Sequence, residues 1–144
     1  MIRGAGAVRA ELDRLLRESD VISLHLPRTP ETVGIIGARE LTLVKPTSVL
    51  INVARGHLVD EGAFLSALEQ GALAGAGLDV LIDEPPSCNH PLVQHPKVLI
   101  TPHMGWYSTS AFVELRMKGI AAVVDVLSGR RPRYVVAEPR GVQD

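Results

Sequence analysis

Two side chains, Arg55 and His103, have the chemistry expected of a catalytic site. Each follows an apolar run that predicts a buried strand, residues 49–53 before Arg55 and 98–101 before His103. A guanidinium presents two parallel donors that match the two oxygens of a carboxylate. An imidazole exchanges a proton near neutral pH. Together they would supply an anchor for an acid substrate and a general acid–base group.

A third candidate is an acidic pair, Asp83 and Glu84, which precedes two prolines. A carboxylate in contact with an imidazolium fixes the orientation of the ring and stabilises its charged form. Either acid could therefore be the partner of His103, and the sequence alone leaves both open.

The composition excludes several classes of partner. The net charge of −1 gives no excess of basic residues, so we expect no nucleic-acid partner. No apolar run approaches the roughly 18 residues needed to span a membrane. Cys88 is the only cysteine, which excludes an internal disulfide and fits the reducing cytoplasm. His90 and His95 lie near it, but without a second cysteine pair or helical histidine spacing we expect no metal site.

Helices and strands alternate along the predicted chain. Asp60 is a good N-cap for the helix after it, and Gly71 is placed to end that helix. Residues 32–36 fit either a short strand or a turn, and 83–96 form a proline-rich connection. We expect helices over 8–18, 38–44, 61–70 and about 109–128, and strands over 21–26, 49–53, 74–80 and 98–101.

This alternation predicts an α/β fold, a parallel sheet with flanking helices. In such sheets, ligand-binding residues lie just beyond the carboxyl ends of the strands. We therefore expect four residues that follow strands to line one edge of the sheet: Pro27, Arg55, Asp79 and His103. The last helix carries apolar residues that step by four and three along one seam: Val113, Met117, Ile120, Val124 and Leu127.

Four sequence blocks resemble the D-isomer-specific 2-hydroxyacid dehydrogenases, in the order and spacing of that family. The similarity extends over about residues 10–135. The resemblance implies a partial Rossmann-type NAD-binding domain that takes in residues 1–144, the last helix included. The blocks are SDVISLHLP with TPET (19–32), LINVARG with LVDE (50–61), GLDV with EP (77–85) and TPH (101–103).

The resemblance also implies a role for each candidate residue. Arg55 would bind the substrate carboxylate and polarise the 2-oxo group, while His103 would exchange the proton. Glu84 would pair with His103, and Asp79 would contact the nicotinamide side of NAD. The residues expected against the cofactor, including its ribose and phosphates, are Leu26, Pro27, Thr32, Val53, Ala54, Arg55, Asp79, His103 and Gly105.

Two positions depart from the commonest pattern of the family. Val53 stands where the family usually has threonine, so one hydroxyl contact to the cofactor would be missing. After His103 the chain continues MGWYS (104–108), which is similar to the C-terminal-binding-protein corepressors and their bacterial dehydrogenase relatives. That likeness implies that Trp106 reaches the substrate pocket beside Arg55 and His103. Packing at the start of the last helix is the alternative for Trp106.

The dinucleotide-binding fingerprint is not found in this sequence. It needs a glycine-rich turn between a strand and a helix, whereas Gly4-Ala5-Gly6 follows no predicted strand and Arg9 stands in place of the third glycine. We therefore interpret the chain as the C-terminal part of a longer enzyme. We expect it to bind NADH weakly on its own, because the pyrophosphate would lack its helix N-terminus. The sequence distinguishes neither NAD from NADP nor one 2-hydroxy acid from another.

The sequence thus predicts a cytoplasmic, NAD-dependent oxidoreductase that acts on the CH–OH group of a D-2-hydroxy acid and is a homodimer when complete. Two alternatives stay open at this point. One is a non-catalytic, NAD(H)-sensing interaction protein, which the corepressor likeness allows, and the other is an inactive remnant. Reduction of glyoxylate, pyruvate or hydroxypyruvate with NADH separates the first reading from both alternatives.

Overall fold

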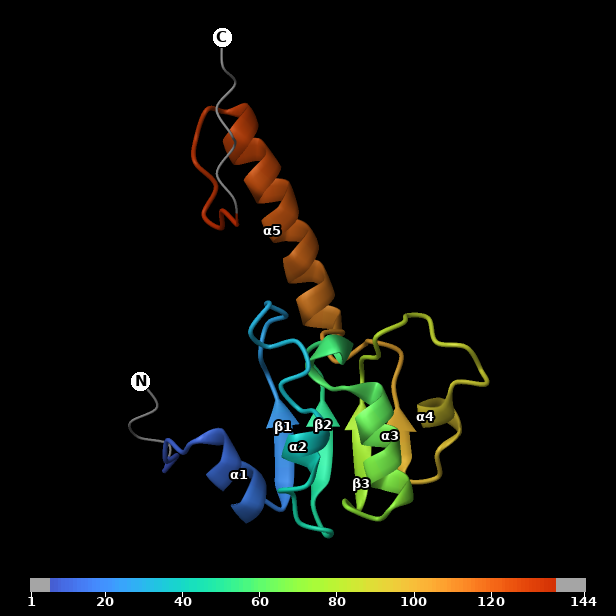
Figure 1. Cartoon of the computed structure of the whole chain (residues 1–144). Coiled ribbons are helices and arrows are strands. Elements are labelled where there is room, and N and C mark those ends of the chain that lie inside the picture. The colour runs from blue at the N-terminus through green and yellow to red at the C-terminus, as the bar shows by residue number, and fades with distance from the viewer. Residues whose placement is uncertain (1–5, 137–144) are drawn as a thin grey trace. The chain divides into compact units, whose positions relative to one another are not determined.

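The chain divides into two compact units in the computed structural model, Met1–Gly105 and Trp106–Asp144 (Figure 1). The structure describes residues 6–136. Gly4 and Ala5, which were considered above for a glycine-rich turn, lie outside the described residues. The first unit contains the sheet and the candidate residues up to Gly105.

A four-stranded parallel sheet forms the centre of the first unit and confirms the predicted α/β fold. The register pairs Leu24 with Asn52 and Asn52 with Leu78, so the strands end level with one another. Their carboxyl ends therefore meet at one edge of the sheet. The strands lie side by side in chain order: β1 (Val21–Leu24), β2 (Val49–Asn52), β3 (Gly75–Leu78) and β4 (Val98–Ile100).

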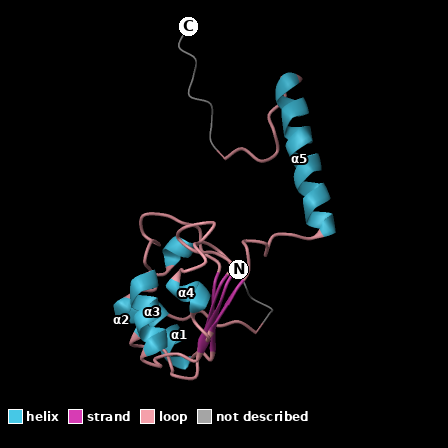
Figure 2. Cartoon of the chain, turned by 90° about the vertical axis from the view of Figure 1, so that its right-hand side faces the viewer, coloured by secondary structure: helices cyan, strands magenta, loops and turns pink. Residues whose placement is uncertain are grey.

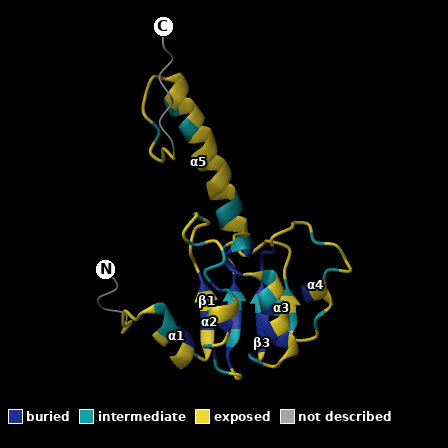
Figure 3. Cartoon of the chain, in the orientation of Figure 1, coloured by how far each residue is buried: buried dark blue, intermediate teal, exposed yellow. Residues whose placement is uncertain are grey.

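Helices cover one face of this sheet, and the core lies between the two layers. Figure 2 shows α1 (Leu12–Glu18), α2 (Ala38–Leu41) and α3 (Glu61–Glu69) on the same side of the strands. Leu16 of α1, Leu50 of β2 and Phe64 of α3 are almost completely buried in this layer. Figure 3 draws the buried residues in dark blue. Burial of such apolar side chains is the main stabilising contribution to the unit.

Most elements are a few residues shorter than the sequence predicts. Helix α1 begins at Leu12 instead of residue 8, because Glu11 makes no side-chain cap and Val8 is exposed, so nothing packs the four residues before it. Strand β1 ends at Leu24 instead of residue 26, where its pairing with β2 also ends. Local propensity alone does not keep such short, unpacked ends in regular structure.

Two segments were read incompletely from the sequence. The proline-rich connection 83–96 contains a short helix, α4 (Pro91–Gln94), which was not predicted. Pro91 occupies its first turn, and the ring of His90 caps it by accepting from the N–H of Leu92. Residues 32–36, left open between strand and turn, form turns followed by a single bridge from Ile36 to Val59.

The turn after β2 leads through a 3-10 helix, η1 (Gly56–Leu58), into α3. Asp60 caps α3 by accepting from the N–H of Ala63 at 3.0 Å, as predicted. Gly71 ends the helix in a left-handed conformation with φ of 71°. Gly56 packs directly on the backbone of the next loop, since a Cβ there would lie 2.1 Å from the carbonyl carbon of Leu81.

The second unit contains α5 (Thr109–Leu127), in agreement with the predicted helix. Ser108 caps it by accepting from the N–H of Ala111. The predicted apolar seam is exposed, from 49% at Val124 to 83% at Leu127. No helix in the described part of the chain is long and apolar enough to cross a membrane.

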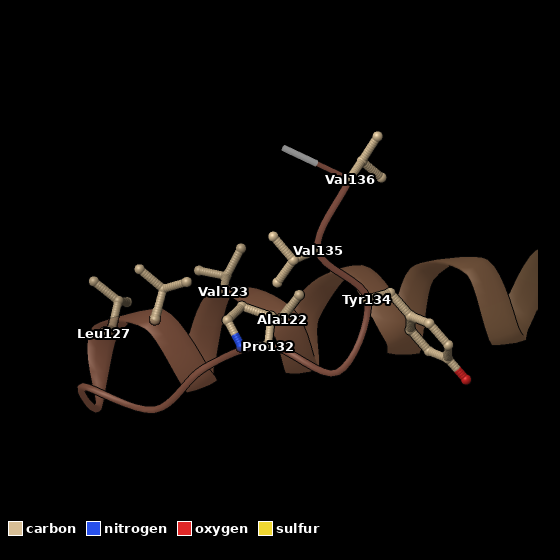
Figure 4. Close-up of a pocket in the computed structure, with 8 residues that line it drawn as sticks. Ala122, Val123, Leu127, Pro132, Tyr134, Val135 and Val136 are labelled. Atoms are coloured by element: carbon tan, nitrogen blue, oxygen red, sulfur yellow. The ribbon is translucent and has the colours of Figure 1, made fainter. Parts of the chain in front are cut away.

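The segment after α5 turns back along the helix and leaves an apolar hollow of about 420 Å³ against it (Figure 4). Residues from both segments form its lining: Ala122, Val123, Val126, Leu127, Pro132, Tyr134, Val135 and Val136.

Replacing Gly56 with Ala should destabilise the first unit by at least about 2 kcal/mol, because overpacking against backbone cannot be relieved by a side-chain rotation. Gly62→Ala is the matched control. A Cβ at Gly62 makes only ordinary contact, at 3.5 Å from Asp60, and alanine favours a helix by up to about 1 kcal/mol over glycine. Urea unfolding measures both changes, and equal effects of the two substitutions would contradict the close approach.

Candidate functional site

Four residues named from the sequence follow the carboxyl ends of the four strands. Pro27 comes after β1, Arg55 after β2, Asp79 after β3 and His103 after β4. Because the strands are parallel and adjacent, these residues lie at one edge of the sheet. Their side chains line two different hollows, with Pro27 and Arg55 in one and Asp79 and His103 in the other.

A short polar contact at this edge joins His103 to Glu84. Nδ1 of His103 lies 2.6 Å from Oε2 of Glu84, and the two side chains are 42% and 35% exposed. The other carboxylate oxygen of Glu84 accepts from the N–H of Leu81 at 3.0 Å. The structure therefore selects Glu84, and not Asp83, as the partner of His103.

The charge on Glu84 is favoured by this geometry. Burial opposes ionisation, but the hydrogen bond from His103 and that from Leu81 N–H outweigh it and lower the pKa of Glu84. Glu84 is thus a carboxylate at neutral pH and accepts both hydrogen bonds. Nδ1 of His103 is then the donor in the pair.

Asp79 holds the chain on both sides of His103. It is only 6% exposed. Its carboxylate accepts from the hydroxyl of Thr101, from the N–H of Met104 at 2.9 Å and from the N–H of Gly105 at 2.7 Å. Burial favours the neutral acid, but these hydrogen bonds and the charge of His103 outweigh it and lower the pKa of Asp79.

The backbone at His103 is in an uncommon conformation. Its φ is 50°, in the left-handed region that residues other than glycine rarely adopt. Such a residue costs on the order of 1 kcal/mol and persists where its surroundings hold it. The three bonds to Asp79 come from residues flanking His103 and provide that restraint.

The turn that carries Arg55 is held by Asn52, the last residue of β2. Asn52 is buried, its Nδ2 donates to the carbonyl of Arg55 at 2.9 Å, and its Oδ1 accepts from the N–H of Ala54 at 3.1 Å. No role was assigned to Asn52 from the sequence. A polar residue at the end of an otherwise apolar strand is the signal that identifies it.

The side chain of Arg55 is exposed and donates to the carbonyl of Ala54 at 2.6 Å. It borders a hollow of about 620 Å³ between the ends of β1 and β2. No acidic residue is among those that line this hollow, whereas two arginines are: the lining consists of His25, Leu26, Pro27, Arg28, Val53, Ala54 and Arg55.

Thr32, expected against the cofactor, uses its hydroxyl within its own loop. The hydroxyl donates to the carbonyl of Pro27 at 2.7 Å and accepts from the N–H of Thr29 at 2.8 Å. It therefore closes the loop after β1. The loop itself borders the Arg55 hollow through Leu26 and Pro27.

Trp106 belongs to the second unit, whereas the other candidates belong to the first. Its ring meets Tyr107 edge to face at 5.4 Å between centroids. Tyr107 in turn packs at 5.9 Å from Phe112, over which the guanidinium of Arg116 lies. These contacts order the aromatic residues at the start of α5.

Replacing Asp79 with Asn should lower the free energy of unfolding most at neutral pH. A carboxylate with a lowered pKa stabilises the fold above its unfolded pKa of about 3.9, and this contribution is lost as the pH falls through the folded pKa. The difference between wild type and Asp79→Asn in urea unfolding should therefore shrink from pH 7 to about pH 3. The exposed Asp20→Asn is the control and should cost less than about 1 kcal/mol. A pH-independent difference for Asp79→Asn would refute the assignment.

Comparison with known proteins identifies the family of this chain. Residues 3–105 match the family model described as "D-isomer specific 2-hydroxyacid dehydrogenase, NAD binding domain". A glyoxylate reductase of Aeropyrum pernix is 44% identical over 133 residues, which are 91% of this chain and 39% of that protein. A glycerate dehydrogenase of Methylorubrum extorquens is 42% identical over 88% of this chain and 40% of its own length.

Solved structures agree as well. The D-isomer specific 2-hydroxyacid dehydrogenase of Lactobacillus delbrueckii ssp. bulgaricus, in its NAD-complexed form, superposes with a TM-score of 0.81 at 35% identity. The match covers 89% of this chain and 43% of that one. The chain thus spans about two fifths of the length of these relatives. It belongs to the D-isomer-specific 2-hydroxyacid dehydrogenase family, and residues 3–105 correspond to its NAD-binding domain.

Proposed function

We propose that this chain supplies the acid–base pair and the carboxylate anchor of an NAD-dependent oxidoreductase that interconverts a D-2-hydroxy acid and a 2-oxo acid. The observation that carries the proposal is the 2.6 Å contact between His103 and Glu84. This pair lies at the sheet edge where Arg55 also emerges. The reaction requires the protein to supply an acid–base group and an anchor for the substrate carboxylate.

The reaction divides cleanly between cofactor and protein. The nicotinamide, when bound, supplies or accepts the hydride at the substrate carbon. In reduction, the oxygen on that carbon must gain a proton, and His103 in its imidazolium form gives it from Nε2. In oxidation, neutral His103 takes the proton back. Glu84 holds the ring by Nδ1, so that Nε2 is the atom that exchanges the proton.

Arg55 has the chemistry of the anchor. Its guanidinium can bind both oxygens of a substrate carboxylate and place the neighbouring carbonyl for attack. Asn52 fixes the backbone of its turn through the Arg55 carbonyl and the Ala54 N–H. We propose Trp106 as a third substrate contact, beside Arg55 and His103.

The hollow beside Arg55 fits an anionic dinucleotide. Its volume of about 620 Å³ lies within the range of ligand pockets, roughly 300–1,000 Å³. Arg28 and Arg55 border it without an opposing acid. The residues proposed against the cofactor are Leu26, Pro27, Thr32, Val53, Ala54, Arg55, Asp79, His103 and Gly105, with Thr32 acting through the loop it closes.

The same proposal extends to the substrate, the complete enzyme and its location in the cell. The substrate is a small 2-oxo or 2-hydroxy acid, and residues 1–144 are part of the NAD-binding domain of a longer, homodimeric enzyme. Cys88 is exposed and has a free thiol, which is compatible with the cytoplasm that we propose as its location.

The test is turnover in a chimera in which this chain replaces the matching 133 residues of the Aeropyrum pernix glyoxylate reductase. The chimera should oxidise NADH with glyoxylate, hydroxypyruvate or pyruvate. Arg55→Lys keeps the charge but loses the two parallel N–H donors of the guanidinium, so kcat/KM should fall by an amount equivalent to about 2–5 kcal/mol. Arg39→Lys, on the exposed surface of α2, is the control. A loss below about threefold for Arg55→Lys would exclude it as the anchor.

The same chimera tests the acid–base pair through its pH profile. Glu84 has a lowered pKa, so it is a carboxylate at neutral pH, and its negative charge stabilises the imidazolium form of a neighbouring histidine. Reduction needs the imidazolium, so kcat/KM falls on the alkaline side. With Glu84→Gln this fall should begin at lower pH, and oxidation should keep more activity at low pH. Asp83→Asn should leave the profile nearly in place. If the two substitutions shift the alkaline fall in kcat/KM equally, or if Glu84→Gln shifts it to higher pH, another acid is the partner of His103.

A further inference from the structure

Glu84 sits in an exposed loop, yet it must hold its carboxylate against His103. The loop runs from the end of β3 to the start of α4, and residues 82–85 in it are exposed. A loop with so little burial opens easily unless something outside it restrains it. The contacts of this loop with other elements therefore decide how well Glu84 is placed.

One side chain from another element contacts the loop on both sides of Glu84. Oε1 of Glu61, in the first turn of α3, accepts from the N–H of Ile82 at 2.7 Å. Its second oxygen, Oε2, lies 3.4 Å from Nε2 of His90. Glu61 thus reaches the loop two residues before Glu84 and again six residues after it.

The tautomer of His90 favours this contact. Its Nδ1 accepts from the N–H of Leu92 at 3.3 Å, so the ring proton is on Nε2, the atom that lies 3.4 Å from Glu61. The side chains of Glu61 and His90 are only 19% and 20% exposed. The attraction between a carboxylate and an N–H group is screened less at such a partly buried place than at the open surface.

Glu61 projects from a helix that is well anchored. Helix α3 is fixed in the core by Phe64 and Leu68, which are almost fully buried. The backbone of Gly56 also packs closely against Leu81 and Ile82. Leu81 is also the residue whose N–H donates to Glu84 at 3.0 Å. A change at Glu61 therefore reaches Glu84 through Ile82 and Leu81.

We propose that Glu61 is a positioning residue that, together with His90, holds the Glu84 loop so that Glu84 keeps its hydrogen bond to His103. Its catalytic meaning rests on the function proposed above, but the geometry can be tested without turnover. The polar contacts of Glu61 described above are with Ile82 and His90. It acts by restraining the loop at Ile82 and at His90, on either side of Glu84.

The experiment compares the full 144-residue chain with Glu61→Ala, by hydrogen exchange of backbone amides and by the NMR signal of the His103 Nδ1 proton. Loss of Glu61 should speed exchange at Ile82 and also at Leu81, by about tenfold or more, because the loop opens more often. The His103 ring proton should broaden or disappear. Glu61→Gln keeps an oxygen for Ile82 and should restore most of the protection. Glu69→Ala, at the exposed end of the same helix, should change neither.

Two outcomes would overturn the proposal. If Glu61→Ala speeds exchange only at Ile82 and leaves Leu81 and the ring proton unchanged, Glu61 is a local cap without effect on Glu84. If Glu61→Ala does not fold, His90→Asn decides, because asparagine still caps Leu92 but does not reach Glu61. It should raise Leu81 exchange about threefold, and an unchanged rate refutes the role of the pair. If the chimera shows no turnover, the proposed function is refuted. The amide-exchange rates of Leu81 and Ile82 would still test the role of Glu61.

Discussion

The arrangement at the sheet edge depends on one buried carboxylate. Asp79 is the first residue after β3, and its two oxygens accept from Thr101, Met104 and Gly105. These partners all belong to the segment that follows β4, so Asp79 ties the ends of two neighbouring strands together. An ionised acid that is nearly buried is costly unless its oxygens are fully hydrogen-bonded. The three bonds satisfy that condition, and they also set the conformation of the chain around His103.

A second constraint joins the loops on either side of the site. Gly56 follows Arg55 directly, and its lack of a side chain lets the Arg55 turn lie on the backbone of Leu81. The same Leu81 donates to Glu84. Arg55 and the His103–Glu84 pair line different hollows, but their loops share this backbone contact. Displacement of one loop should therefore displace the other.

The fold could be predicted from the sequence because its signals are local. Apolar runs identified all four strands, and Asp60 and Gly71 marked the ends of α3. Helix α4 was missed because its four residues lie within a proline-rich connection, where too few positions are available to show a helical period. The start of α1 was placed early because a helical pattern does not reveal whether anything packs on it.

The candidate site was predictable to a lesser degree. The residue types at strand ends indicated Arg55, Asp79 and His103, but they left Glu84 and Asp83 equally open as partners of His103. The family resemblance favoured Glu84, and the structure has Glu84 in contact with His103. Asn52 went unassigned because its partners are backbone groups, and Glu61 because one of its partners is the backbone of Ile82. Backbone N–H and carbonyl groups occur at every position, so a sequence gives no sign of which ones a side chain will meet.

The left-handed backbone at His103 limits which residues can occupy that position. Outside glycine, asparagine, aspartate and histidine accept this conformation most readily, whereas β-branched and bulky residues are strained by it. The site is thus confined to a small set of side chains before any chemistry is considered, and histidine is the member of that set whose proton exchanges near neutral pH. Glutamate or tyrosine could not take over the acid–base role proposed for His103 by a single substitution without also changing the conformation of the chain that Asp79 holds.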